Sequence, residues 1–415
     1  MFFAKAKRFL LWCAVGLFAV SCSSFSKHSS QANNYLQLGE YDKAIEVLKP
    51  LAEKESDDQL VYLLDYGMVL HLAGRYQESI KVFSKADDIA AIKDYHSISR
   101  IAGSILLNEG MVQYKGDDFE KVFIHVYLAL DYLMLNNLDD ALVEARRVNN
   151  ILQKYRDEAK RDYEQNGFAN YLSGAMWEAD RRWDDAYISY KDAYKQLGDK
   201  KILHKDLIRS SRLASRSDDF EKWVSKFKDV PKEEGQRHLH DKDAEVVFIY
   251  QQGKGPIKEP NPDFPRIPKL FPQGTDAAKA RLYINGKSYG DTEPLYSLTS
   301  VAIKTLDDQY AGLIAKRAAG IAAKYVVSDQ IAKKNELLGF LSWLGLNAID
   351  QADLRQWSNL PEAFQIARVW VPAGEYEVSA VSVNGRGDVL SEKMQPKKIK
   401  LHEKQKAFLT WRSFR

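Results

Sequence analysis

One residue pattern decides the fold, and it occurs twice, first in Leu38–Ile45 (LGEYDKAI) and again in Ala73–Ile80 (AGRYQESI). The two copies lie 35 residues apart. In each copy an aromatic residue follows the glycine by two positions, and a small residue follows the aromatic residue by three. A glycine can end a helix in a left-handed turn, and a small residue lets two helices approach closely. The pattern therefore predicts pairs of helices joined by tight turns.

Further copies extend this array. Units with the same spacing of small and aromatic residues cover 128–148 and 174–193, and a degenerate unit over 218–227 ends the series. The unit resembles the tetratricopeptide repeat, a helix–turn–helix of about 34 residues. The resemblance implies a stacked α-solenoid whose concave face binds a peptide or protein. The wider gap between the second and third copies predicts an insertion or a poorly matching repeat at 90–118.

The N-terminus predicts export and lipidation. Lys5, Lys7 and Arg8 precede a twelve-residue apolar stretch, which is too short to span a bilayer of about 30 Å. The following Ala-Val-Ser-Cys resembles a bacterial lipobox, which implies a signal peptide at 1–21 and acylation of Cys22. Ser23 resembles the sorting signal for the outer membrane. An ordinary secretory signal and an uncleaved anchor are the alternatives.

Composition and charge exclude several classes of protein. The chain has 415 residues, of which 45% are hydrophobic and 28% are charged, as in ordinary globular proteins. Removal of 1–21 takes away three basic residues, so the formal charge falls from +3 to zero, which argues against nucleic-acid binding. The only cysteines are Cys13 and Cys22, so a disulfide scaffold or a cysteine-based metal site is excluded.

The distribution of prolines divides the mature chain. Only Pro50 and Pro231 precede residue 250, so the first half can be continuously helical and the second half cannot. We predict a tetratricopeptide-like helical domain at 22–228, a polar linker at 229–243 and a smaller α+β domain with an antiparallel sheet at 244–415. Within the smaller domain we expect strands at 244–250, 280–287 and 397–411, two strands joined by a Pro-Ala-Gly turn at 367–381, a long loop at 251–275 and a helix at 306–350.

One part of the predicted helix is strongly apolar. Residues 337–349 contain almost only apolar residues and glycine, but they are too few to cross a bilayer. Earlier in the same helix, small and apolar residues recur at intervals of three and four, namely Ala311, Ile314, Ala315, Ala318, Ala319, Ala322, Ala323 and Val326. The apolar stretch is either part of the core or a face that contacts a membrane or a partner.

A stretch at 114–147, together with the lipobox, resembles a family of bacterial tetratricopeptide-repeat lipoproteins. The resemblance implies no activity and no catalytic residues. Candidate partner-binding residues in and near this stretch are Glu120, His125, Tyr132, Glu144, Arg146, Arg147 and Trp177. The alternatives are structural: a packed histidine, a helix-surface ion pair between Glu144 and Arg147, and aromatic rings in the core.

The C-terminal segment is basic. Lys397, Lys398, Lys400, Lys404 and Lys406 are candidates for contact with anionic lipid headgroups or wall polymers. Lysines also protect sheet edges from aggregation, which is the alternative interpretation.

No catalytic signature, phosphate loop, metal-ligand spacing or cofactor motif occurs in the sequence. We therefore expect a protein that is not an enzyme and needs neither a cofactor nor a metal. The predicted function is a scaffold, lipid-anchored at the periplasmic face of the outer membrane, that binds envelope proteins through its helical repeats and acts in cell-envelope or peptidoglycan assembly, with peptidoglycan as a further partner. The alternatives are an enzyme acting on wall polysaccharide between the two halves, and a surface-exposed adhesin or export component.

Overall fold

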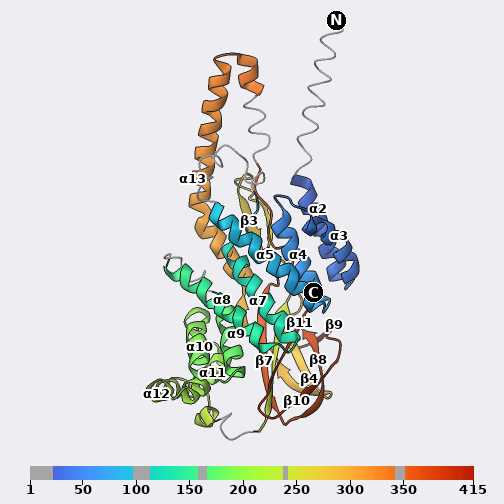
Figure 1. Ribbon diagram of the computed structural model, residues 1–415, viewed down its shortest axis with the longest axis vertical. Coiled ribbons are helices and arrows are strands. Elements are labelled where there is room, and N and C mark those ends of the chain that lie inside the picture. The colour runs from blue at the N-terminus through green and yellow to red at the C-terminus, as the bar shows by residue number, and fades with distance from the viewer. Residues whose placement is uncertain (1–21, 97–112, 158–165, 237–241, 342–350) are drawn as a thin grey trace.

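The computed structural model describes residues 22–96, 113–157, 166–236, 242–341 and 351–415. The predicted signal peptide, residues 97–112 of the predicted insertion and residues 342–349 of the apolar stretch lie outside the described residues. The predicted fold class is confirmed: helical hairpins of the tetratricopeptide type are followed by an α+β part (Figure 1).

The helices of the first half follow one another as hairpins. Each first helix is joined to its second helix by a short turn, in the pairs α2/α3, α4/α5, α7/α8, α9/α10 and α11/α12. A short 3₁₀-helix, η3, follows at Lys232–Gln236. The bounds are Cys22–Gln37 (α2), Tyr41–Glu53 (α3), Gln59–Leu72 (α4), Tyr76–His96 (α5), Asp118–Met134 (α7), Leu138–Asp157 (α8), Gly167–Ala179 (α9), Trp183–Leu197 (α10), Lys201–Leu213 (α11) and Ser217–Lys226 (α12).

The turns of these hairpins share one backbone conformation. Gly39 and Gly74 have a φ of 74°, and Asn136, Arg181 and Ser215 occupy the same position with φ between 57° and 59°. In every one of these turns the next N–H donates to a carbonyl five residues earlier, at 2.9 Å. This is the Schellman motif, which ends a helix and satisfies its last carbonyls. The left-handed turn is therefore kept even where no glycine is present.

Small residues hold the two helices of a hairpin close together. A Cβ atom added to Gly67 would lie 2.7 Å from the ring of Phe83, and one added to Gly174 would lie 2.7 Å from the ring of Tyr190. Both aromatic residues follow their glycine by sixteen positions. The aromatic ring of the second helix thus fills the space that the glycine of the first helix leaves.

The second half contains three sheets. A four-stranded sheet has the order β11-β1-β7-β6, a five-stranded sheet has the order β10-β8-β4-β5 with β9 beside β8, and β2 pairs with β3. All pairs are antiparallel except β1 with β11. The bounds are Ala244–Gln252 (β1), Ile257–Pro260 (β2), Pro268–Phe271 (β3), Lys279–Ile284 (β4), Lys287–Asp291 (β5), Glu293–Ser297 (β6), Ala363–Val371 (β7), Gly374–Val383 (β8), Val389–Lys393 (β9), Lys397–Leu401 (β10) and Lys406–Arg412 (β11).

Three local expectations differ from the structure. The predicted loop at 251–275 contains the paired strands β2 and β3. The predicted single strand at 397–411 divides at a turn into β10 and β11, which lie at the edges of two different sheets. The helix expected at 306–350 begins earlier, as α13 (Leu298–Ala332), because the Ser297 side chain accepts a hydrogen bond from the N–H of Ser300 and caps it.

One hydrophobic core joins the two halves, and a second lies within the second half, between strands of its two larger sheets. Two of the first helices are buried nearly all round: 13 of 14 residues in α4 and 12 of 13 in α9. The second helices bury far fewer residues, 4 of 13 in α3 and 5 of 15 in α10. The other side of the first helices is covered by the four-stranded sheet and its connections, whose residues belong to the same core cluster. The helical array therefore curves around the second half (Figure 1).

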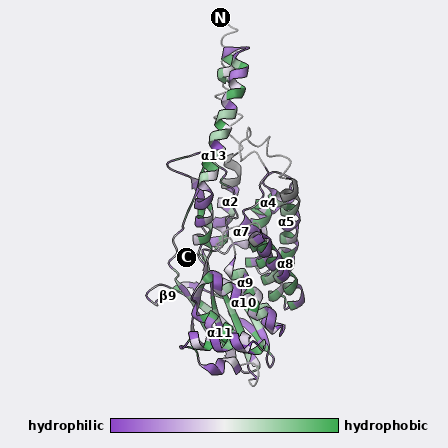
Figure 2. Cartoon of the chain, turned by 90° about the vertical axis from the view of Figure 1, so that its left-hand side faces the viewer, coloured by the Kyte–Doolittle hydropathy of each residue, from purple (hydrophilic) through white to green (hydrophobic). Residues whose placement is uncertain are grey.

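Helix α13 projects away from the rest of the protein. Its first turns pack against the core through Leu298 and Ala302, and the rest of its 35 residues, about 52 Å in all, extends beyond the other helices (Figures 1 and 2). After a turn at 333–335, residues 336–341 form a helical segment that returns along α13. We call residues 311–341 the α13 hairpin.

Candidate functional site: the inner face of the helical repeats

Aromatic rings from both halves pack together on the side of the first helices that faces the four-stranded sheet, which we call the inner face. The ring of Phe364 from β7 stacks on Phe168 of α9, with centroids 4.1 Å apart, and on Phe123 of α7 at 5.4 Å. The indole of Trp357, which lies between α13 and β7, packs against Tyr127 and Phe83 at 5.6 and 5.5 Å. The surface where such repeats commonly bind a peptide is thus occupied by the chain itself.

The segment Arg355–Asn359 lies on the inner face as a bound peptide would. The Trp357 N–H donates to the carboxylate of Glu120 at 2.7 Å. The N–H and the hydroxyl of Ser358 both donate to Asp65, at 3.0 and 2.9 Å. The Arg355 guanidinium pairs with Asp58 at 2.9 Å. Three carboxylates, two at α4 and one on α7, therefore hold this segment.

Near the middle of the inner face, Gln251 of β1 joins the halves through its side-chain amide. Its oxygen accepts a hydrogen bond from the Tyr127 hydroxyl at 2.8 Å. Its nitrogen donates to Thr410 at 2.9 Å and to His71 Nε2 at 3.2 Å. The other ring nitrogen of His71 pairs with Asp131 at 2.6 Å. This arrangement fixes the histidine with a proton on Nδ1, because Nε2 acts as an acceptor.

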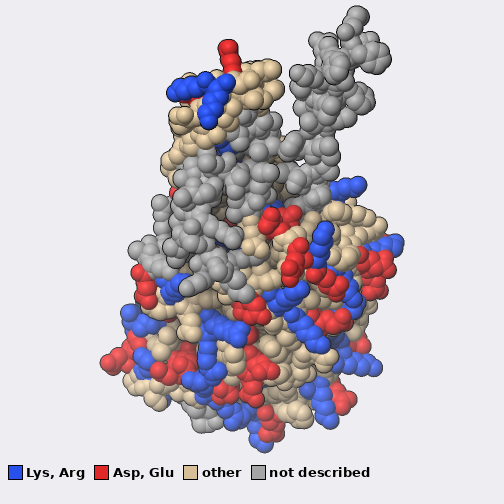
Figure 3. All heavy atoms as spheres, turned by 45° about the horizontal axis from the view of Figure 1, so that its top comes forward, with Lys and Arg blue, Asp and Glu red and all other residues tan. Residues whose placement is uncertain are grey.

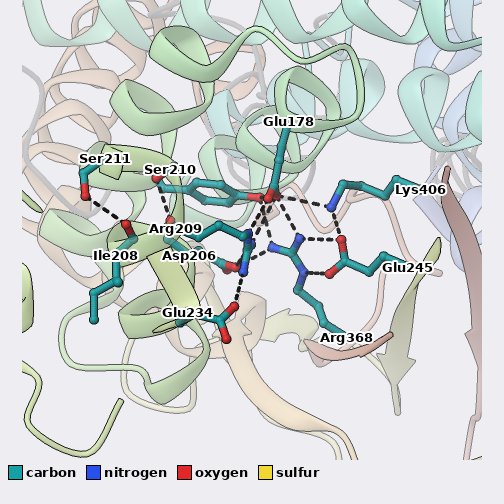
Figure 4. A network of polar contacts seen from close by, with 11 residues as sticks. Glu178, Asp206, Ile208, Arg209, Ser210, Ser211, Glu234, Glu245, Arg368 and Lys406 are labelled. Carbon is teal, nitrogen blue, oxygen red and sulfur yellow. Dashed lines mark hydrogen bonds and ion pairs between the residues drawn. The ribbon is translucent and has the colours of Figure 1, made fainter. Parts of the chain in front are cut away.

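A buried cluster of charges closes the far end of the inner face (Figure 4). Arg368 of β7 lies at its centre and binds Glu245 through two nitrogens, at 2.5 and 2.8 Å. It also reaches Asp206 of α11 at 2.5 Å and Glu178 of α9 at 2.8 Å. The side chain of Arg368 is only 7% exposed, and the three carboxylates are 1% exposed or less. The remaining members are Arg209, Glu234 and Lys406.

The charges of this cluster stabilise one another. Burial alone would lower the pKa of Arg368, but Asp206, Glu178 and Glu245 hold it well above its ordinary value. Burial alone would raise the pKa of Glu245, but the positive charges of Arg368 and Lys406 lower it to about 2. Arg368 and Glu245 are therefore both charged at neutral pH, whereas burial raises the pKa of Asp206 and lowers the pKa of Lys406. Such a cluster holds the two surfaces together, because removing one partner would leave buried charges unpaired.

Of the predicted partner-binding residues, Glu120 faces the second half. Besides the Trp357 N–H, it accepts hydrogen bonds from the Tyr114 hydroxyl at 2.5 Å and from the Asp117 N–H at 2.9 Å, which forms a capping box for α7. Burial raises its pKa to about 7. Glu120 thus caps a helix and holds the inner-face segment.

The other predicted partner-binding residues lie between helices of the array. The His125 ring is placed between Glu144, at 2.7 Å, and Asp87, at 3.4 Å. Arg147 is exposed and pairs with Asp87. Trp177 is buried, and the guanidinium of the exposed Arg146 lies 5.1 Å from its ring centroid. Tyr132 is half-buried in the last turn of α7.

The contacts of His125 predict a pH dependence of stability. Burial alone would lower its pKa, but Asp87 and Glu144 raise it to about 9 from the ordinary 6.5. A histidine whose pKa is raised by folding stabilises the fold fully below pH 6.5, and this contribution is lost as the pH rises through 9. The free energy of unfolding of His125→Gln is therefore expected to lie below that of the wild type at pH 6, with the gap closing by pH 9.

Urea unfolding of both proteins across this range measures the difference. Burial raises the pKa of Asp65 and of Glu120 to about 7, so both titrate in the same range. These groups are common to both proteins, and only the difference between wild type and variant reports on His125. A difference that stays constant with pH would contradict the assignment.

The predicted anionic-surface lysines separate into two groups. Lys398, Lys400 and Lys404 are exposed, while Lys397 is half-buried, and burial lowers its pKa. Lys406 is buried in the charged cluster, where it pairs with Glu178 and Glu245.

The α13 hairpin carries the most apolar exposed surface of the described residues. Fifteen large hydrophobic side chains are exposed in the described part of the chain, and six of them lie between 325 and 340. They are Tyr325, Val326, Val327, Leu337, Leu338 and Phe340. Of the periodic residues that predict the helix, Ala311, Ala315, Ala318 and Ala322 also face solvent. Figure 2 shows this projecting helix and its mixed hydropathy.

In the ranges that the structure describes, no group of three His, Cys, Asp or Glu side chains could hold a metal ion. Within the same ranges, every helix is too short or too polar to cross a bilayer.

Several residues of the inner face were not singled out from the sequence, namely Asp58, Asp65, Gln251, Arg355 and Arg368. Arg368 offered one signal, because it is a charged residue in the middle of an apolar strand. A charge in such a place indicates a buried partner. Asp65 offered a similar signal in the apolar helix α4.

No protein-family model matches this sequence, and no curated protein matches it. Solved repeat structures are similar to about half of the chain. A putative kinesin light chain of Podosopora anserina with TPR-like repeats is 13% identical, covering 52% of this chain and 98% of its own, with a TM-score of 0.35. MamA of Desulfovibrio magneticus RS-1 is 17% identical, covering 52% and 96%, with a TM-score of 0.33. BtubC of P. vanneervenii is 14% identical, covering 55% and 85%, with a TM-score of 0.35.

Proposed function

We propose that this protein is a lipid-anchored scaffold of a bacterial cell envelope that binds a protein partner through the exposed side of the α13 hairpin. The anchor is the acylated thiol of Cys22, and the membrane is the outer membrane. The observation that carries the proposal is an exposed apolar helix face on a repeat protein whose own inner face is already occupied.

The sequence supports the anchor. A basic start, a short apolar stretch and a lipobox-like tetrapeptide precede Cys22. Two or three acyl chains, each contributing about 0.8 kcal/mol per buried methylene, suffice for stable membrane attachment.

The occupied inner face directs the partner elsewhere. A peptide that bound there would have to displace the segment Arg355–Asn359, the Phe364 ring and the ion pairs of Arg368. Separating the buried ion pairs would leave charges unpaired at a cost of several kcal/mol. An outside surface that is already exposed and apolar carries no such cost.

The exposed side of α13 suits another helix. Ala311, Ala315, Ala318 and Ala322 follow one another at intervals of four, three and four residues. This is the heptad spacing of a helix–helix contact, and alanine allows close approach of the two backbones. Ile314 and Val326 flank this row and are also exposed. The partner that we propose is therefore an envelope protein that supplies an apolar helix.

The end of the hairpin favours a protein over a lipid bilayer as the occupant. Lys333, Lys334 and Glu336 are exposed at its turn. Figure 3 shows basic and acidic side chains beside uncharged residues at this end of the molecule. Insertion of this turn into hydrocarbon would remove these charges from water, which is costly. Docking of a helix along the alanine row leaves them solvated.

Thiol labelling of single cysteines tests the proposal. The variants Ala315→Cys and Ala318→Cys are each treated with a maleimide, once in envelopes and once as purified protein. Ser288→Cys, which lies on the solvent-exposed strand β5, is the control. We expect the α13 cysteines to be protected in envelopes and reactive after purification, and the control to react equally in both. Protection must persist when a mild detergent dissolves the lipid.

Three results would overturn the partner assignment. Equal labelling in envelopes and in the purified protein would mean that nothing covers α13. Loss of protection on addition of detergent would identify lipid as the occupant. Protection of the purified protein at high concentration would identify a second copy of this chain.

A further inference from the structure

A second feature lies beside the inner-face segment Arg355–Asn359 and away from α13. A cavity of about 260 Å³ opens between α2 and three connections of the second half. Its lining combines neutral hydrogen-bonding side chains with three cations and contains no Asp or Glu. The side chains that matter most are those of Asn33, Lys254, Gln356, Arg412 and Phe414.

Arg412 is a buried cation without a carboxylate partner among the described residues. Its side chain is 93% buried, since the residue is 7% exposed. Two of its nitrogens donate to the carbonyl oxygens of Asn359, Gly253 and Leu360 at 2.6–3.0 Å. Its third nitrogen, Nε, is buried and has no hydrogen-bond partner. Burial lowers the pKa of this guanidinium to about 10.

Glu392, the acid that acts electrostatically on Arg412, is engaged elsewhere. Glu392 contributes only a small electrostatic effect at Arg412, and its carboxylate accepts hydrogen bonds from the N–H groups of Phe414 and Arg415 at 2.9–3.2 Å. A buried charge without an opposite partner is unusual, because its desolvation is not offset. In the same lining, the side-chain oxygen of Gln356 is buried without a donor.

The geometry points to a binding site for a small ligand that carries an oxyanion. We propose that this cavity takes an acidic sugar or a molecule of similar size, with a carboxylate or phosphate group near Arg412 and Lys254. Its hydroxyl or amide groups meet the Asn, Gln and Ser side chains of α2 and of the opposite wall. The ring of Phe414, 4.7 Å from the guanidinium, supplies an apolar surface beside the anion.

The cavity dimensions limit the ligand. Sites for drug-sized molecules span about 300–1,000 Å³, so a volume slightly below this range fits a single sugar residue. This proposal does not depend on the scaffold role, because it concerns a different surface from the α13 hairpin.

Matched pairs of probes test the requirement for an anion. The protein with Cys22→Ser is titrated with N-acetylmuramic acid and N-acetylglucosamine, which differ in one carboxylate-bearing group, and with glucose 1-phosphate and glucose. Calorimetry measures the affinity of each probe. We expect the acidic member of at least one pair to bind saturably, and its neutral counterpart to bind at least about tenfold more weakly. The two pairs separate a carboxylate ligand from a phosphate ligand.

Variants locate the site. Lys254 is half-buried in the lining of the cavity. Lys254→Gln is expected to weaken binding of the acidic probe about tenfold and to leave the unfolding transition of the protein unchanged. Lys398→Gln removes the same charge from an exposed strand and should leave binding intact. The proposal is overturned if no acidic probe binds, if neutral and acidic sugars bind equally, or if Lys254→Gln and Lys398→Gln have the same effect.

Discussion

Arg368→Met is expected to destabilise the whole protein by about 3–5 kcal/mol, because it leaves three buried carboxylates without their central partner. Glu245 and Asp206 would each lose a bond of 2.5 Å, and Glu178 one of 2.8 Å. These carboxylates come from both halves, so the lost interactions are those that hold the sheet against the repeats. Urea unfolding monitored by tryptophan fluorescence measures the change.

A second arginine provides the control for this experiment. Arg386 is exposed in the turn between β8 and β9, in the same half of the chain. Arg386→Met should change the free energy of unfolding by less than about 0.5 kcal/mol. Equal effects of the two substitutions would mean that the buried cluster does not join the halves.

Cys22→Ala is expected to abolish lipidation completely. The variant should incorporate no labelled palmitate and should no longer fractionate with the outer membrane. It should also retain residues 1–21, because in our proposal the signal peptide is cleaved only after the thiol has been acylated. Labelling in cells, mass spectrometry and membrane fractionation measure the three properties.

The other cysteine is the matched control. Cys13 lies within the apolar stretch that we propose is removed, so Cys13→Ala should be labelled and sorted as the wild type is. If Cys22→Ala were still shortened at its N-terminus, the signal would be an ordinary secretory one. If it stayed in the outer membrane, an acylated thiol would not be the anchor.

The hairpin repeat could be predicted because its local chemistry is visible in the sequence. Gly39 and Gly74 mark left-handed turns, and Gly67 marks a close helix approach. The turns at Arg181 and Ser215 have the same left-handed conformation without a glycine, because a Schellman motif tolerates other residues at a modest energetic cost. Those repeats were recognised only from their small and aromatic residues.

The docking of the two halves could not be predicted in the same way. Arg368 and Asp206 are 162 residues apart, and Gln251 and His71 are 180 apart. Sequence periodicity reports which face of an element is apolar and does not report what covers that face. For the same reason, the alanine row of α13 predicted a helix and gave no indication that the row would face solvent.

One cross-linking measurement tests the central claim that the second half occupies the inner face of the repeats. The hydroxyl oxygens of Ser29 on α2 and Ser358 are 2.7 Å apart, although 329 residues separate them in sequence. In a chain with Cys13→Ser and Cys22→Ser, the pair Ser29→Cys and Ser358→Cys supplies the only thiols. Its control pairs Ser30→Cys with Ser358→Cys, since one residue along a helix turns the thiol by about 100°.

The account predicts that mild oxidation joins positions 29 and 358 by a disulfide within one chain, seen by non-reducing electrophoresis and peptide mass mapping. The control pair should stay largely reduced under the same conditions. If positions 29 and 358 stayed reduced in folded protein, or joined no faster than the control, the inner face would be open and the account would be wrong.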